Sequence, residues 1–396
     1  MIKLLIGGSP CTKWSIAQKN NRETEPSGIG WELFRNYVIA KEKFKPDFFL
    51  YENNKSAAQP IKDEISKELG VDLMYINSAL VSAQNRQRFY AFNWRVEQPR
   101  DRGILLVDIL ASGMAFRDKA YTLDANYYKT LGNIGFDSQA GRRKMVAEPV
   151  SVYGAEKGKA FALTATYGKV SLRDTLLKHE REMIAEPIPI NTTVDGKSQT
   201  IKAQYGFTSV QNICCYDSTY GASGVAIKTD EHPTPFTGSG KDKESIKRVY
   251  EVKNGLIEVK GRVYSINLPD GYYIIRKLTV TECCRLQTLP DDYCRAVSPT
   301  QAYKGLGNGW TAEVIIHILN GALKDIPRDE ELIVLSMYDG IGTGRYCLDK
   351  MGFTNVKYYA HEIDKFARII ANSNYPDIIQ CGDAFNVRKD DWKIGG

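Results

Sequence analysis

The sequence contains no apolar run of about 18 residues, the length that a membrane-spanning helix needs. Its first residues form a strand-like pattern without the charged region and cleavage site of a signal peptide. The eight cysteines lie at irregular positions, and none has the Cys-x-x-Cys or Cys/His spacing of a zinc site. These absences predict a cytoplasmic protein with reduced cysteines, no membrane association and no bound metal.

Length and composition are typical of a folded globular protein. The chain has 396 residues, 43% hydrophobic and 25% charged, which allows two domains or one large α/β domain with an insertion. The net charge of +6 is a mild excess that many enzymes share. Lysine and arginine gather in the middle of the chain, at residues 142–144, 241–247 and 260–262. This clustering, more than the net charge, favours a nucleic-acid partner.

Strands and helices alternate at both ends of the sequence. In residues 1–100 we expect strands at 2–7, 46–51, 73–77 and 88–94, and helices at 30–44 and 59–69. Toward the C-terminus we expect helices at 311–323, 343–351 and 365–374, and strands at 332–339, 356–361 and 378–382. This alternation predicts a mostly parallel sheet covered by helices on both faces.

The middle of the chain, residues 101–273, has a different composition. Glycine, threonine, tyrosine and short β-branched runs dominate, with helical periodicity only near 172–186. A degenerate repeat joins residues 119–125 and 159–165, with a third copy at 232–237. We interpret this region as an inserted β-rich module with interleaved basic and aromatic residues; the alternative is a solvated insert of no special role.

A glycine turn at residues 338–344 follows one predicted strand and opens a helix. Glycines there let the backbone approach a ligand closely, and a helix N-terminus favours polar or anionic groups. Glu362 ends the next strand about 20 residues further on, where a carboxylate can accept hydrogen bonds from ribose hydroxyls. Asp383 ends the strand after that. These positions predict an adenosine-type pocket; the alternative is three unrelated capping residues.

Gly8-Ser9-Pro10-Cys11 ends the first predicted strand, and Glu52 ends the second. Such a cysteine suits a nucleophile, although most cysteines are small buried hydrophobes. A thiolate beside a carboxyl group fits attack on an electron-poor pyrimidine, with sulfur adding at C6 and the acid acting at N3. Arg86 and Arg88, at a spacing of two in a strand, can favour the thiolate and bind the ring's carbonyl oxygen. Salt bridges on an exposed strand face are the alternative for this arginine pair.

These residues resemble the motifs of the DNA (cytosine-5)-methyltransferase family. Cys11 matches the Pro-Cys nucleophile motif, Glu52-Asn53 the Glu-Asn-Val motif, and Gly307-Asn308-Gly309 the late Gly-Asn motif. The remaining matches are Gln84, Arg86 and Arg88 to Gln-x-Arg-x-Arg; Arg276, Thr279, Glu282, Arg285, Leu286, Gln287 and Pro290 to Arg-x-x-Thr-x-x-Glu-x-x-Arg-Leu-Gln-x-x-Pro; and Tyr338 to Gly342 to Phe-x-Gly-x-Gly. The matches lie mostly in residues 1–94 and 274–385.

The resemblance implies a Rossmann-like class I methyltransferase fold with S-adenosyl-L-methionine as cofactor. Residues 1–100 would form the nucleophile half, 101–273 a β-rich target recognition domain, and 274–396 the late motifs and cofactor-binding half. The catalytic residues would be Cys11, Glu52, Arg86 and Arg88. The cofactor-binding residues would be Tyr338, Asp339, Gly340, Gly342, Glu362, Ile363, Asp383, Pro10 and Asn308. The substrate would be a cytosine flipped out of double-stranded DNA.

Three features depart from the family's pattern. The motif order is rotated, with the nucleophile half first, which predicts a circular permutation joined through residues 324–331. The second feature is Asn54, which replaces the usual valine. The third is a pair of aromatic residues: Tyr338 replaces phenylalanine, and Trp310 follows Gly309. Both keep the aromatic or packing character and lean toward phage-type and de novo-type members.

Two other functions are considered. A transfer-RNA cytosine methyltransferase shares these motifs, but its relatives carry little between the arginine motif and the Arg-Leu-Gln motif, where this chain has a long insert. A non-catalytic DNA-binding paralogue would be expected to have lost one of the four catalytic residues, and all four are present. The sequence leaves open the recognised site and whether a restriction endonuclease is a partner or a phage protects its own DNA. We expect a monomer.

Overall fold

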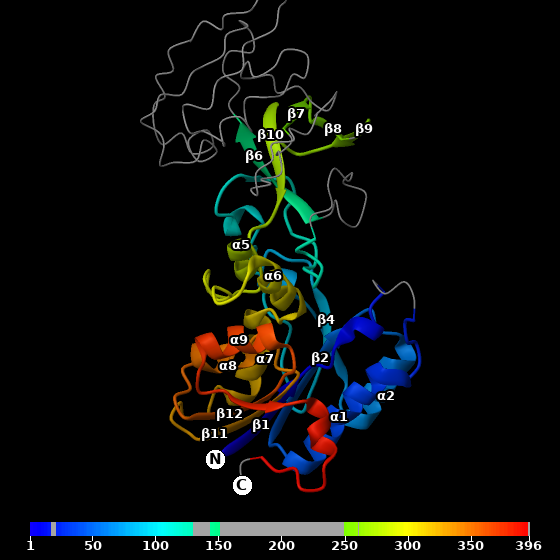
Figure 1. Cartoon of the computed structure of the whole chain (residues 1–396), viewed down its shortest axis with the longest axis vertical. Coiled ribbons are helices and arrows are strands. Elements are labelled where there is room, and N and C mark those ends of the chain that lie inside the picture. The colour runs from blue at the N-terminus through cyan, green and yellow to red at the C-terminus, as the bar shows by residue number, and fades with distance from the viewer. Residues whose placement is uncertain (17–20, 130–142, 151–248, 260, 395–396) are drawn as a thin grey trace, which may run out of the picture. The chain divides into compact units, whose positions relative to one another are not determined.

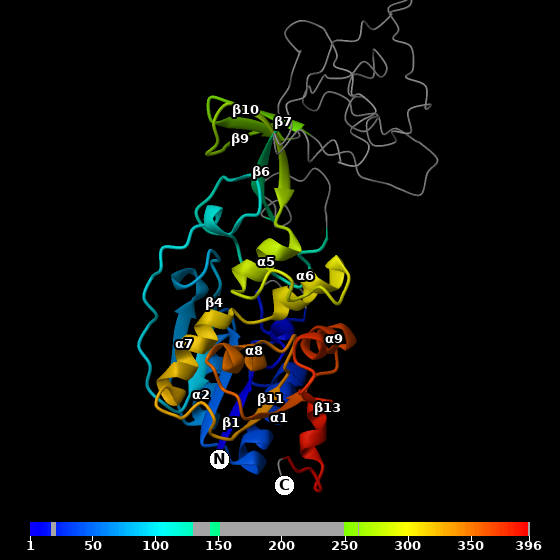
Figure 2. The same cartoon turned by 90° about the vertical axis from the view of Figure 1, so that its left-hand side faces the viewer.

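The computed structural model describes residues 1–16, 21–129, 143–150, 249–259 and 261–394. The chain separates into two compact units. Unit 1 contains Met1–Ile109, Asp118–Thr130 and Thr279–Gly396, and unit 2 contains Leu110–Arg117 and Leu131–Leu278. Each unit is built around its own sheet (Figures 1 and 2).

Unit 1 contains a seven-stranded sheet with the order β13-β12-β11-β1-β2-β4-β3 among the described residues. The strands are β1 (Ile2–Gly7), β2 (Phe48–Asn54), β3 (Leu73–Asn77), β4 (Gln87–Phe92), β11 (Leu332–Met337), β12 (Val356–His361) and β13 (Ile379–Gly382). The five strands from β13 to β2 are parallel, whereas β4 is antiparallel to both of its neighbours. The first strand of the chain therefore lies inside the sheet, between β11 and β2.

Helices cover both faces of this sheet (Figures 1 and 2). One face packs against α1 (Gly28–Phe44) and α2 (Gln59–Leu69), where Phe34 and Ile61 are buried with Leu5 and Leu335. The other face carries α7 (Ala312–Leu323), α8 (Thr343–Lys350) and α9 (Lys365–Asn374). Unit 1 also contains α5 (Val280–Leu286) and α6 (Pro299–Asn308). The expected mixed α/β architecture is confirmed for this part of the chain.

Two strand boundaries differ from the prediction at positions that matter for the site. Strand β2 continues to Asn54, because Glu52, Asn53 and Asn54 still pair with β4, so Glu52 lies inside the strand. Strand β4 begins at Gln87, so Arg86 lies just before it. Polar side chains at a strand end hide the continuation of its hydrogen-bond ladder from sequence patterns.

Unit 2 contains an antiparallel sheet of six strands among the described residues, in the order β5-β6-β10-β7-β8-β9. They are β5 (Met114–Ala115), β6 (Lys144–Val150), β7 (Val249–Lys253), β8 (Leu256–Val259), β9 (Arg262–Ser265) and β10 (Gly271–Lys277). Its apolar face buries Tyr250, Ile257 and Ile275. Glu148 of β6 and Arg276 of β10 form an ion pair of 2.7 Å, so the first arginine of the Arg-x-x-Thr motif belongs to this sheet.

Several predictions for the insert fall on residues outside the described ones. They are the helix near 172–186, the repeat copies at 159–165 and 232–237, and the basic cluster at 241–247. The first repeat copy, 119–125, belongs to unit 1, where Gln84 forms a β-bridge with Ala120.

Candidate active site

The carboxyl ends of the parallel strands form one edge of the sheet in unit 1. The strand register aligns Gly382, His361, Met337, Gly7 and Tyr51 in a single row across five strands. The next residue in each strand is, in the same order, Asp383, Glu362, Tyr338, Gly8 and Glu52. The structure thus brings the beginning of the Pro10-Cys11 loop, Glu52 and the predicted cofactor residues to the same edge.

The Cys11 loop is anchored by the residues just before Cys11. Ser9 is buried, and its hydroxyl lies 2.7 Å from the Tyr51 hydroxyl in a hydrogen bond. The Asn53 side-chain amide donates to the Ser9 carbonyl oxygen at 2.9 Å. Cys11 begins a short 3-10 helix; it is a free cysteine and the residue is partly exposed. The loop therefore holds a partly exposed cysteine on a fixed base.

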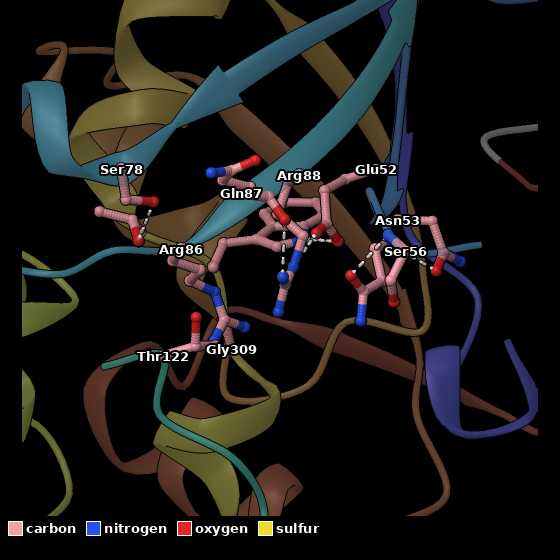
Figure 3. Close-up of polar contacts among 12 residues, drawn as sticks. Glu52, Asn53, Ser56, Ser78, Arg86, Gln87, Arg88, Thr122 and Gly309 are labelled. Carbon is pink, nitrogen blue, oxygen red and sulfur yellow. Dashed lines mark hydrogen bonds and ion pairs between the residues drawn. The ribbon is translucent and has the colours of Figure 1, made fainter. Parts of the chain in front are cut away.

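Glu52 is held by two donors, one on each carboxylate oxygen. Arg88 Nε lies 2.9 Å from Oε1, and both side chains are nearly buried (Figure 3). The indole Nε1 of Trp310 donates to Oε2 at 3.0 Å. A Cβ at Gly8 would lie 2.6 Å from the Glu52 carbonyl oxygen, so only glycine fits at the start of the cysteine loop. These contacts fix the carboxyl group against the first residue of that loop.

Arg86 makes a different set of contacts from Arg88 (Figure 3). Its guanidinium is buried and donates to the backbone carbonyls of Leu123, Gly307 and Gly309 at 3.0, 3.2 and 2.8 Å. Burial lowers the pKa of Arg86 to about 9, and the charge of Arg88 adds to this shift. The charges of Glu52 and Cys11 oppose it, so both residues lie within electrostatic range. Arg86 therefore connects two backbone segments near the site, one at Leu123 and one at Gly307–Gly309.

Residues of the Arg-Leu-Gln motif hold the backbone around the site through hydrogen bonds. Thr279 and Glu282 form a capping box at the start of α5, with hydrogen bonds of 3.2 and 2.7 Å. Gln287 is buried and donates to Leu306 and Gly309 carbonyl oxygens. Gln84, also buried, accepts from the Leu123 backbone N–H at 2.9 Å. In this chain the glutamines of both motifs hold neighbouring backbone segments in place through side-chain hydrogen bonds.

The glycine turn before α8 has an unusual backbone. Tyr338, Gly340 and Gly342 all have positive φ angles, of 62°, 64° and 79°. Such a conformation is uncommon for a non-glycine residue. The Tyr338 hydroxyl donates to the Leu33 carbonyl oxygen at 2.8 Å, and Glu362 Oε2 accepts from the Gly340 N–H at 2.8 Å. The turn is therefore tied both to α1 and to the end of β12.

Two buried polar atoms at this turn have no hydrogen-bond partner among the described residues. They are Asp339 Oδ2 and Thr343 Oγ1. Asp339 Oδ1 accepts from Ser336 and Tyr358 at 2.7 and 2.6 Å. Burial raises the pKa of Asp339 to about 6. Unpaired buried polar groups are costly in a folded protein, and they are often found where a ligand binds.

The other predicted cofactor residues lie nearer the surface. Asp383 is exposed and caps a 3-10 helix, its Oδ1 accepting from the Phe385 N–H at 2.9 Å. Ile363 is 71% exposed, and Pro10 and Asn308 are exposed as well. An exposed apolar side chain such as Ile363, next to Glu362, is free to pack against a flat ligand group.

Sequence reasoning missed three contributors to the geometry. Trp310 was expected to pack, yet it donates to Glu52. Tyr51 precedes Glu52 and anchors Ser9, and the Thr343 hydroxyl at the start of α8 has no partner among the described residues. Thr343 lies between Gly342 and Gly344 of the turn, which is a sequence signal that could have identified it. The partners of Trp310 and Tyr51 are visible only in the fold.

Comparison with known proteins now identifies the family. The sequence model of C-5 cytosine-specific DNA methylases matches residues 1–324. The chain belongs to the C-5 cytosine-specific DNA methylase family. The resemblance inferred from the motifs is confirmed. The match ends before β11, β12 and β13, although these strands share the methylase sheet with β1.

The relatives come from bacteria and their phages. The orphan methyltransferase M.SPRI of Bacillus phage SPR is 24% identical over 366 residues, covering 79% of this chain and 80% of that protein. The Type II methylase M.HgiEI of Herpetosiphon aurantiacus is 28% identical over 37% of this chain and 32% of its own. The Type II methyltransferase M.HgiBI of the same organism is 34% identical over 22% of each chain.

None of the helices in the described part of this methylase combines the length and the apolar character that a membrane span needs. Within the same residues, no group of three or more histidine, cysteine or acidic side chains is arranged to hold a metal ion.

Proposed function

We propose that this family member is a DNA (cytosine-5)-methyltransferase that transfers a methyl group from S-adenosyl-L-methionine to C5 of a cytosine in duplex DNA. One observation carries the proposal: the Cys11 loop, the Glu52 carboxyl group and the glycine turn before α8 meet at one edge of one sheet. A nucleophile, an acid and a donor pocket are what methylation of an electron-poor pyrimidine requires.

Cys11 and Glu52 would act together in activating the ring. The Cys11 thiolate forms a bond to C6, the C5–C6 π electrons move through C4 toward N3, and N3 takes the proton of Glu52. C5 then has the electron density needed to accept a methyl group. Afterwards a water molecule takes the C5 proton, the C5–H electron pair re-forms the C5–C6 double bond as the Cys11 thiolate leaves, and N3 returns its proton to Glu52. Arg88 stabilises the Glu52 carboxylate that forms in the first step.

The glycine turn fits the polar parts of S-adenosyl-L-methionine. Asp339 Oδ2 and Thr343 Oγ1 are buried and unpaired among the described residues, which suits a ligand with an ammonium and a carboxylate. Glu362 would accept from ribose hydroxyls. Bound there, the cofactor supplies a methyl group on a positively charged sulfur. The other residues that would line the pocket are Tyr338, Gly340, Gly342, Ile363, Asp383, Pro10 and Asn308.

The cytosine would have to leave the DNA duplex to reach Cys11. The target carbon is stacked between neighbouring bases in a duplex, and extrusion costs a few kcal/mol. We assign the recognition of flanking bases to unit 2, whose antiparallel sheet is separate from the sheet that carries Cys11. Base edges in the major groove would then supply the sequence preference.

We also infer that the chain is circularly permuted within its family. The first strand, β1, lies between β11 and β2, and the family match stops at residue 324, before the strands that follow α7. Both observations support a chain in which the cofactor half was moved behind the nucleophile half. Cutting and rejoining a chain at surface positions leaves such a sheet intact.

The direct test is methyl transfer to duplex DNA and, separately, to transfer RNA, followed by bisulfite sequencing of the DNA. We expect 5-methylcytosine in DNA and no labelled RNA. Labelled transfer RNA would favour the RNA methyltransferase. Failure to form either product, together with no covalent adduct on 5-fluorocytosine DNA, would favour the non-catalytic paralogue. The sequence context of the cytosines that resist bisulfite conversion would give the recognised site.

A further inference from the structure

We propose that Trp310 is a positioning residue for the general acid: its indole N–H holds the Glu52 carboxyl group so that the acid proton is directed to the base. This inference rests on the proposed function and adds a residue to the same site. Its basis is the pair of donors on Glu52, Trp310 Nε1 to Oε2 at 3.0 Å and Arg88 Nε to Oε1 at 2.9 Å.

Trp310 is fixed on both sides of its backbone. The carbonyl oxygen of the preceding Gly309 accepts from Arg86 at 2.8 Å and from Gln287 at 3.3 Å. The hydroxyl of the following Thr311 donates to Gln287 Oε1 at 2.9 Å and lies 2.9 Å from the Ser78 hydroxyl. Thr311 and Gln287 are buried. The indole is therefore aimed at Glu52 by bonds that do not depend on Glu52 itself.

The chemistry of the two donors determines where an acid proton can lie. A carboxyl group offers about four lone-pair positions, two on each oxygen. Arg88 occupies one on Oε1 and Trp310 one on Oε2, and neither an indole N–H nor a guanidinium can accept a hydrogen bond. A proton on Glu52 is thus restricted to the two positions that remain. When it passes to N3, the same donors stabilise the carboxylate left behind.

Gly8 limits the movement of Glu52 on a third side. A Cβ at Gly8 would lie 3.0 Å from Glu52 Oε2, so the start of the cysteine loop packs against the oxygen that Trp310 binds. The Glu52 carboxyl group is thus contacted from three sides: by Arg88 of β4, by Trp310 between α6 and α7, and by Gly8 of the Cys11 loop. Loss of the indole donor alone would leave Oε2 without a directed partner while the ring's packing is retained.

Trp310→Phe tests the proposal because it removes the donor and keeps an aromatic ring. We expect kcat for DNA methylation to fall about 10- to 100-fold, as for loss of a hydrogen bond to a charged group, with KM for DNA and for the cofactor changed less than about threefold. In a Glu52→Gln background, measured by single-turnover transfer of a labelled methyl group, the same change should cost less than about threefold. An equal loss in both backgrounds would overturn the proposal.

Two further variants keep the test decisive. Trp94→Phe is the matched control, because Trp94 Nε1 makes an indole hydrogen bond of 2.9 Å to the Ile318 carbonyl oxygen. It should change kcat less than about twofold, and a loss as large as that of Trp310→Phe would overturn the assignment. If Trp310→Phe does not fold, Thr311→Val carries the test, since it frees the segment without touching the indole. Introduced alone, Thr311→Val should lower the rate of methyl transfer several-fold, and in the Glu52→Gln background it should leave that rate unchanged. A lower rate in both backgrounds would contradict the proposal.

Failure of the inference and failure of the proposed function give different results. Wild-type protein that methylates duplex DNA at C5 but shows no coupling between positions 310 and 52 leaves the function standing and removes Trp310 from the mechanism. Wild-type protein that forms no 5-methylcytosine overturns the function and this inference together.

Discussion

Arg88 Nε lies 2.9 Å from Glu52 Oε1, and the two side chains are 10% and 12% exposed. This ion pair joins β4 to its antiparallel neighbour β2, at the same edge of the sheet where the Cys11 loop begins. An ion pair so nearly buried ties stability to function, because removal of either partner leaves an uncompensated charge.

Arg88→Ala is therefore expected to lower both stability and activity. The free energy of unfolding should fall by about 3 kcal/mol, and methyl transfer by at least about a hundredfold. Denaturant unfolding and single-turnover kinetics measure the two effects. Arg102→Ala is the control, because the Arg102–Glu313 pair has a half-exposed arginine and should contribute less than about 1 kcal/mol. Equal destabilisation by both variants would contradict this explanation.

Cys11→Ser is expected to abolish turnover while leaving DNA affinity largely intact. A serine hydroxyl has similar size but stays protonated and weakly nucleophilic at neutral pH, so no bond to C6 forms. Bisulfite sequencing measures the product and a gel-shift titration measures DNA binding. Cys381→Ser serves as a control at another partly exposed thiol and should retain wild-type turnover. Undiminished methylation by Cys11→Ser would show that the proposed mechanism is wrong.

Glu362→Ala is expected to weaken binding of the cofactor more than binding of DNA. Its Oε2 accepts from the Gly340 N–H and its Oε1 from the Ile363 and Asp364 N–H groups, so the residue orders the turn and the start of α9. Calorimetric titration should show S-adenosyl-L-methionine binding reduced at least about tenfold. Glu362→Gln, which keeps an acceptor for Gly340, should lose less. A larger loss of DNA affinity than of cofactor affinity would contradict the assignment.

Asp339 is expected to make stability and cofactor binding depend on pH in opposite directions. Burial raises its pKa from 3.8 to about 6, with the Glu362 charge adding to the shift and hydrogen bonds from Tyr358 and Ser336 opposing it. Because the folded-state pKa lies above the unfolded one, its contribution to stability is fully present below about 3.8 and is lost as pH rises through about 6. The carboxylate that could pair with a ligand ammonium forms only above about 6.

Asp339→Asn tests both halves of this prediction. At pH 7 the variant without ligand should be about 1–3 kcal/mol more stable than wild type, and this gain should shrink at pH 5. Cofactor affinity of the wild type should fall from pH 7.5 to pH 5.5, whereas the variant should bind weakly at both. Thermal unfolding and calorimetric titration at the two pH values measure these effects. A wild-type affinity independent of pH would argue against an ammonium partner for Asp339.

The sequence predicted the elements of unit 1 well, and there is a physical reason. The helices Gln59–Leu69 and Lys365–Asn374 and the strands Leu73–Asn77 and Val356–His361 occur at the predicted residues, since short loops and clear periodicity mark them. Carboxyl ends of parallel strands meet at one edge, so Glu52, Glu362 and Asp383 could be expected to lie on the same side. Their roles in binding and catalysis stay predictions.

The contacts that fix the site could not be predicted in this way. Trp310 and Glu52 are far apart in the sequence, and no pattern in either segment signals their hydrogen bond. The guanidinium of Arg86 donates to three backbone carbonyls, and nothing in the sequence around Arg86 signals these partners. A buried guanidinium must donate its hydrogen bonds to acceptors within the fold, and only the tertiary arrangement determines which acceptors lie nearby.

The position of β1 between β11 and β2 also has a consequence for biosynthesis. The ribosome makes β1 long before its hydrogen-bonding partner Leu332–Met337. Until then one side of β1 is an open edge, a feature that favours pairing with other chains. Pairing between such distant segments is slow to form. Nascent chains of this protein must therefore wait for β11 before the sheet that precedes the Cys11 loop can form completely.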